Sequence, residues 1–134
     1  QAPYLKEEVQ DNLNILKSGK TFELKNPMLA SIFRESVQPY MISWIKYNPQ
    51  IEIAKLQMPV LIVNGTKDLQ VAVHDAELLK KAKPEAELVL IENMNHIFKE
   101  IKGDDTENIQ SYSNPDAPIA PKLTNPITVF IKAL

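Results

Sequence analysis

Two side chains that can do acid-base chemistry each follow a run of aliphatic residues. Asp68 comes shortly after residues 60–63 (Val-Leu-Ile-Val), and His96 comes shortly after residues 88–91 (Leu-Val-Leu-Ile). Neither run alternates with polar residues, which is typical of strands buried on both faces, as in a parallel sheet covered by helices. The stretch between the two runs predicts a helix. A right-handed crossover would set the strands parallel and bring both side chains to the carboxyl edge of the sheet.

An imidazole beside a carboxylate can take a proton from a nucleophile, while the carboxylate fixes the tautomer of the ring and stabilises its cation. His96 and Asp68 fit these two roles. Each residue also has a simpler explanation, since His96 can be a loop histidine bonded to nearby backbone and Asp68 can be a helix N-cap or an Asx-turn. Their occurrence at two successive strand ends favours the catalytic interpretation.

This arrangement resembles the C-terminal part of the α/β-hydrolase superfamily, whose catalytic triad runs Ser, then Asp or Glu, then His along the chain. The match consists of a late strand at residues 59–63, the G-x-x-D turn from Gly65 to Asp68, and the Met-Asn-His sequence that ends at His96. The resemblance covers most of the chain.

The resemblance implies an α/β fold class. We expect a partial α/β-hydrolase fold with two late parallel strands at about 59–64 and 86–92, flanking helices, and lid-type helices on the N-terminal side. It also implies a serine hydrolase of the esterase, acyl hydrolase or peptidase-like kind, with Asp68 and His96 as the acid and the histidine of its triad.

The sequence departs from the family pattern because it has no nucleophile elbow. The motif G-x-S-x-G needs two glycines four residues apart, whereas the glycines here are Gly19, Gly65 and Gly103. The resemblance therefore implies that the serine and the oxyanion hole come from sequence outside these 134 residues. On this interpretation the chain alone is inactive, and the parent protein acts on a small ester or amide substrate.

Length and composition bound the other possibilities. A chain of 134 residues predicts a single domain, 1–134, in which 1–47 form the lid or helical segment and 48–134 the late strands, catalytic loops and terminal helix. With 15 basic and 17 acidic residues and no basic block, a nucleic-acid partner is not expected. No apolar run has the length of a membrane span. The absence of cysteine excludes disulfides and thiol chemistry but leaves the compartment open, cytoplasmic or exported.

No cofactor or metal is expected. Three scattered glycines cannot form a phosphate-binding loop, and the two histidines, His74 and His96, do not have the spacing of H-E-x-x-H.

Five residues are candidates for a substrate pocket. Tyr40, Met41 and Trp44 give one predicted helix an aromatic-rich face, and Leu69 and Ile97 follow the two catalytic candidates directly. Such a helix face belongs to a hydrophobic core more often than to a ligand pocket, so both roles stay open.

Hydrophobic periodicity, caps and prolines place the remaining elements. We expect helices at 3–18, 37–47 (capped by Ser36), 48–56 and 71–83, a short helical turn at 97–100, a long flexible loop at 102–120, and a final helix that begins at Pro121 or at Pro126 with Asn125 as its cap.

A second hypothesis is a noncatalytic α/β module that self-associates or binds a partner. Two parallel strands leave hydrogen-bonding edges and apolar surface exposed, so we expect the isolated chain to self-associate.

Overall fold

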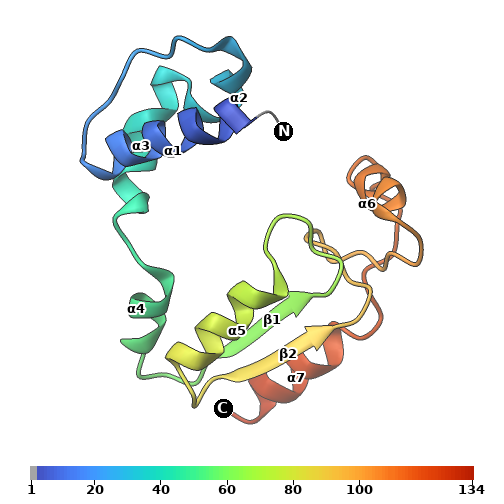
Figure 1. The fold of residues 1–134 in the computed structure, drawn as a ribbon. Helices are drawn as coiled ribbons and strands as arrows, with labels where there is room; N and C mark the ends of the chain where they lie inside the picture. Colours follow the sequence, from blue (N-terminus) through green and yellow to red (C-terminus); the bar gives the residue numbers. More distant parts are fainter. Residues whose placement is uncertain (1–2) are drawn as a thin grey trace. The chain divides into compact units, whose positions relative to one another are not determined.

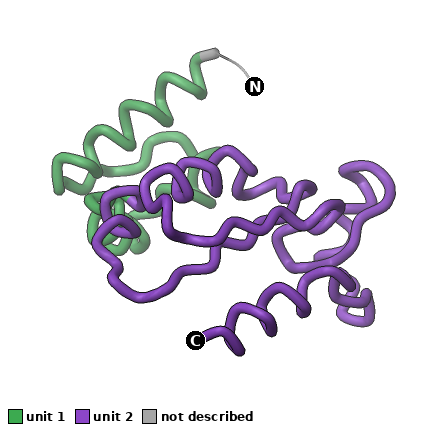
Figure 2. The backbone as a smooth tube through the Cα atoms, turned by 90° about the horizontal axis from the view of Figure 1, so that it is seen from below, with its two compact units in different colours: residues 1–48 green, residues 49–134 purple. Residues whose placement is uncertain are grey.

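The computed structural model describes residues 3–134, which are drawn in Figure 1. The chain forms two compact units, Gln1–Asn48 and Pro49–Leu134, shown in Figure 2. The two units are described separately below as unit 1 and unit 2.

Unit 1 is helical. The expected first helix is present and ends at Lys17, and Gly19 follows with φ +80°, a left-handed conformation that favours glycine. Buried apolar side chains from the different helices form its core: Leu16, Leu29, Phe33 and Met41. The elements are α1 (Pro3–Lys17), the 3₁₀ helix η1 (Pro27–Leu29), α2 (Ala30–Phe33), the 3₁₀ helix η2 (Glu35–Val37) and α3 (Gln38–Ile45).

Unit 2 is a mixed α/β unit with a small parallel sheet. Strands β1 and β2 pair in register from Leu61 with Glu87 to Gly65 with Ile91. The parallel pair predicted from the sequence is thus confirmed, although each strand is shorter than expected. The elements are α4 (Pro49–Ala54), β1 (Leu61–Gly65), α5 (Val73–Ala82), β2 (Glu87–Ile91), α6 (Asp105–Ser111) and α7 (Thr124–Lys132).

A helix packs on each face of this sheet (Figure 1). On one face, Ile62 of β1 packs with Ala76 of α5 and with the partly buried Leu88. On the other, Val63 and Val89 contact the cluster to which α7 contributes Ile127. Because both faces are covered, neither strand alternates apolar with polar residues, which explains the continuous apolar runs in the sequence.

The end of β1 lies unusually close to the chain after β2. Thr66 N donates to Ile91 O, and Lys67 N donates to Met94 O, each at 3.0 Å. A Cβ at Gly65 would collide with the Met94 carbonyl, so only glycine allows this approach. The G-x-x-D turn is therefore fastened by its backbone to the segment that leads to His96.

None of the helices formed by residues 3–134 is long and apolar enough to cross a membrane.

The structure corrects the predicted loop at 102–120, which contains helix α6. Asp104 caps this helix by accepting from Thr106 N and Glu107 N. The face that α6 buries carries Asn108 and Ser111 rather than apolar side chains. A helix that buries polar side chains lacks the helical periodicity of apolar residues, so the sequence pattern could not reveal it.

The helical turn predicted at 97–100 is also wrong. This segment makes isolated antiparallel bridges, Met94 with Glu100 and Lys99 with Ile119. Phe98 has φ +65°, a conformation unfavourable for a bulky side chain and incompatible with a regular helix.

The predicted starts of α3, α5 and α7 and the predicted cap of α3 need correction, and α5 begins at Val73 rather than at residue 71. Helix α7 begins at Thr124, so neither predicted start is right, and Pro126 lies in its first turn, where a missing N–H costs no intrahelical bond. Helix α3 begins at Gln38, and Ser36 belongs to η2 and does not cap α3.

We predict that Gly65→Ala lowers the free energy of unfolding by about 1–3 kcal/mol, because the new methyl group forces β1 away from Met94. Urea unfolding measures this change. Gly103→Ala is the matched control, since the one short contact of its Cβ would be with the flexible end of the Glu107 side chain. Equal stability of the two variants would contradict the close approach.

Candidate active site

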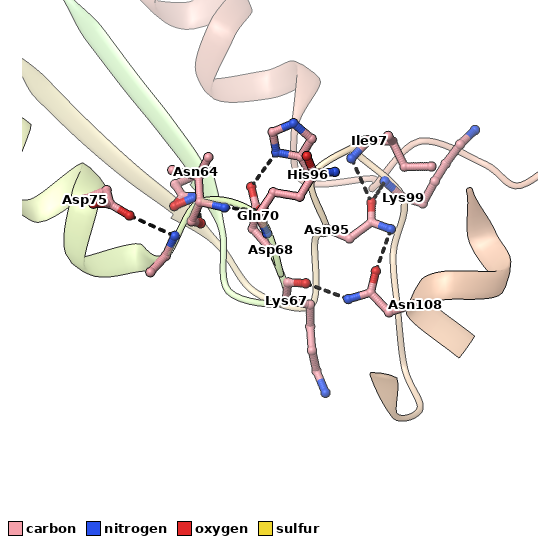
Figure 3. A network of polar contacts seen from close by, with 12 residues as sticks. Asn64, Lys67, Asp68, Gln70, Asp75, Asn95, His96, Ile97, Lys99 and Asn108 are labelled. Carbon is pink, nitrogen blue, oxygen red and sulfur yellow. Dashed lines mark hydrogen bonds and ion pairs between the residues drawn. The ribbon is translucent and has the colours of Figure 1, made fainter. Parts of the chain in front are cut away.

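Asp68 and His96 meet at the carboxyl edge of the sheet. Asp68 Oδ2 lies 3.0 Å from His96 Nδ1, as Figure 3 shows. The Asp68 side chain is 7% exposed, whereas that of His96 is 40% exposed. The carboxylate is therefore held inside the protein and the imidazole faces outward. Among residues 3–134, no hydrogen-bond partner occupies Nε2, the other ring nitrogen.

Asp68 uses its two oxygens for different tasks. Oδ1 accepts from the backbone N–H groups of Gln70 at 2.8 Å and Val71 at 2.9 Å, while Oδ2 faces His96. The Asx-turn considered as an alternative is thus present together with the histidine contact. The turn fixes the carboxylate in the orientation that the imidazole needs.

The environment keeps Asp68 ionised. Burial alone would raise the pKa of this carboxyl, but the N–H groups of Val71 and Gln70 and the neighbouring His96 stabilise the charged form more strongly. The pKa of Asp68 is therefore lower than usual. An ionised carboxylate can accept a proton from Nδ1, and in that tautomer Nε2 is the basic nitrogen of the ring.

The loop that carries His96 is held by Asn95, whose side chain is almost fully buried. Asn95 Oδ1 accepts from Ile97 N at 3.2 Å and from Lys99 N at 2.9 Å. Its Nδ2 donates to Asn108 Oδ1 at 3.0 Å and to Ser111 Oγ at 2.8 Å. All four hydrogen-bonding positions of this amide are used, so the turn around His96 is fixed from inside.

Sequence reasoning missed Asn95 and Asn108 as supports of the site, and Ser111 as a hydrogen-bond partner of Asn95. The only signal was the position of Asn95 next to His96. Asn108 and Ser111 lie in a polar stretch whose composition predicts a loop.

A cavity of about 610 Å³ opens beside the Asp68–His96 pair. Its lining is mostly apolar: Ile62, Val63, Asn64, Gly65, Asp68, Val71, Asp75, Ala76, Leu79, Met94, Asn95, His96, Ile97 and Phe98. The wall includes one unusual polar group. Asn64 Nδ2 donates to Val71 O, but its buried Oδ1 has no hydrogen-bond partner in the part of the chain that the structure describes.

The five predicted pocket residues lie in different places. Ile97 lines this cavity, but Leu69, which is half exposed, is not part of its lining. Met41 is buried in the core of unit 1, in agreement with the core role considered for its helix face. Tyr40 and Trp44 are exposed on unit 1, with ring centroids 6.4 Å apart.

The chemical groups in this cavity suit proton transfer. No serine lines it, and Ser111 is engaged with Asn95 and Asn108. Residues 3–134 contain no group of three or more His, Asp or Glu side chains arranged to hold a metal ion. The site thus offers a base oriented by a carboxylate, beside an apolar space.

Comparison of the sequence with protein-family models and with curated proteins finds no match.

We predict that Asp68→Asn weakens the pH dependence of stability. A lowered carboxyl pKa contributes stability that is present above the unfolded value of about 3.9 and is lost as the pH falls through the folded value. The difference in unfolding free energy between about pH 7 and about pH 3 should be smaller in the variant than in the natural chain. Chemical denaturation at both pH values measures it, with the exposed Asp116→Asn as control. An unchanged difference would contradict the lowered pKa.

Proposed function

We propose that this chain supplies the acid and the histidine of a Ser-Asp-His triad in a serine hydrolase of the α/β-hydrolase type, acting on small esters or amides. The observation that carries the proposal is the hydrogen-bonding contact between Asp68 Oδ2 and His96 Nδ1 beside an apolar cavity. Parallel pairing of β1 and β2 provides the strand ends from which such a pair projects in open α/β sheets.

In this mechanism, Asp68 holds the proton on Nδ1, and Nε2 of His96 takes the proton of the attacking hydroxyl. The carboxylate stabilises the resulting imidazolium, which then protonates the leaving group. The lowered pKa of Asp68 supports this role, since a protonated acid could not stabilise the cation.

The serine comes from outside residues 1–134, because the chain lacks the elbow motif and no serine lines the cavity. The exposure of His96 leaves Nε2 accessible to such a group. Side chains of Val71, Leu79, Ile97 and Phe98 give the cavity an apolar wall suited to an acyl group.

The proposal predicts that a fluorophosphonate probe labels the whole protein that contains these residues, and that His96→Ala lowers the labelling rate by about 100-fold or more. His74→Ala is the matched control, because His74 is the other histidine and is largely exposed on α5. Labelling is read by gel fluorescence and intact mass.

Two results would contradict the proposed function. One is the absence of labelling in well-folded natural protein. The other is equal labelling of the natural protein and the His96→Ala variant.

A second candidate is the noncatalytic module that associates with itself or with a partner. The two-strand sheet favours it, because β1 and β2 pair only with each other among the described residues and each retains an unpaired edge. Sedimentation velocity over a range of concentrations tests it, and a monomer at all concentrations would count against self-association. This candidate does not account for the Asp68–His96 contact.

A further inference from the structure

We propose that Asn108 of α6 is a positioning residue, which holds Asp68 and His96 at their hydrogen-bonding distance by bridging the two residues that precede them. This inference rests on the proposed function, since it concerns the alignment of the same pair. The bridge runs between the loop from β1 to α5 and the loop from β2 to α6. Figure 3 shows Asn108 between Lys67 and Asn95.

One arm of the bridge reaches the loop of the acid. Asn108 Nδ2 donates to Lys67 O at 2.6 Å. That carbonyl belongs to the planar peptide group between Lys67 and Asp68. The hydrogen bond therefore fixes the orientation of the peptide plane that precedes the Asp68 side chain. The Asx-turn orients the carboxylate from its C-terminal side, and Asn108 holds the peptide on its N-terminal side.

The other arm reaches the loop of the histidine. Asn108 Oδ1 accepts from Asn95 Nδ2 at 3.0 Å. Asn95 in turn holds Ile97 N and Lys99 N, the backbone groups one and three residues after His96. Displacement of the Asn95 amide would therefore release the turn.

Both arms need one side chain that donates and accepts at once, which an amide provides and an apolar residue does not. Asn108 is fully buried, so water cannot replace a lost partner. Loss of either hydrogen bond would leave a buried polar group unpaired. The backbone bond from Lys67 N to Met94 O also ties the two loops, at the peptide between Met94 and Asn95, but it constrains neither the Lys67 carbonyl nor the Asn95 side-chain amide.

Helix α6 is itself anchored to the acid loop. Lys67 Nζ donates to Gly103 O at 3.1 Å, and Gln70 Nε2 donates to the Tyr112 hydroxyl at 3.0 Å. These contacts lie on either side of Asp68 along the chain. They hold α6 in the place from which Asn108 can reach both loops.

The test is the downfield ¹H resonance of the hydrogen-bonded Nδ1 proton of His96, recorded on the whole chain at low temperature. The chain has two histidines, so loss of the resonance in His96→Ala and its retention in His74→Ala assign it. This signal reports the Asp68–His96 bond directly and does not depend on a serine.

Two variants remove the bridge. Asn108→Ala removes both arms. Asn108→Asp keeps the shape and the acceptor for Asn95, but at about pH 8 its carboxylate cannot donate to Lys67 O. Asn108→Asp is therefore informative even if Asn108→Ala does not fold. Ser111→Ala is the matched control, because it removes a buried partner of Asn95 and leaves both arms of Asn108 in place.

We expect the resonance in the natural chain and in Ser111→Ala, and its loss through fast exchange with solvent in both Asn108 variants. In the whole protein we expect Asn108→Asp to label with fluorophosphonate about 100-fold more slowly, the effect of misaligned catalytic groups.

The positioning role is overturned if folded Asn108→Asp keeps the natural resonance, if Ser111→Ala loses it equally, or if the natural chain shows none. Failure of the proposed function is a different result. The resonance would then respond to Asn108 as expected, but the natural protein would not react with the probe.

Discussion

The candidate site depends on the parallel pairing of β1 with β2. Since parallel strands end at the same edge, the residues after Gly65 and after Ile91 must leave the sheet side by side. The absence of a side chain at Gly65 then lets the turn that carries Asp68 approach the carbonyl of Met94. Two segments 28 residues apart in sequence are brought within hydrogen-bonding distance by main-chain geometry.

Asp68 combines a local structural role with the chemical role proposed for it. Its Oδ1 closes a turn with Gln70 and Val71, and the same hydrogen bonds stabilise the charge that Oδ2 presents to His96. The Asx-turn and the proposed catalytic role, which were alternatives in the sequence, are therefore compatible in one residue. A carboxylate fixed in this way needs little reorganisation when a charge develops on the imidazole, which is the physical basis of electrostatic preorganisation.

The sequence alone predicts the parts of unit 2 that depend on apolar patterns and on main-chain topology. The two strands, the helix between them and the juxtaposition of Asp68 with His96 belong to this group. It does not predict the polar support. Asn95 and Asn108 are buried by pairing with each other and with backbone groups, and a stretch that packs through hydrogen bonds has the composition of an exposed loop.

The residues that line the cavity are difficult to predict from the sequence. A cavity wall is assembled from residues of several elements, so Ile97 and Phe98 contribute to it while the half-exposed Leu69, next to Asp68, does not. Met41 is apolar, as a pocket residue would be, but it lies in the core of unit 1. Apolar character identifies residues that avoid water, and only the packing decides which cavity or core they occupy.

The most direct test of the central claim is the tautomer of His96, read from the ¹⁵N chemical shifts of its ring at about pH 9, where imidazoles are neutral. Correlation to the carbon-bound ring protons makes this measurement independent of proton exchange, and the exposed His74 is an internal reference in the same spectrum. We expect His96 to carry its proton on Nδ1 and none on Nε2, because the ionised Asp68 accepts from Nδ1. A His96 ring protonated on Nε2, or a mixture of the two tautomers, would contradict the proposal that this pair is arranged for catalysis.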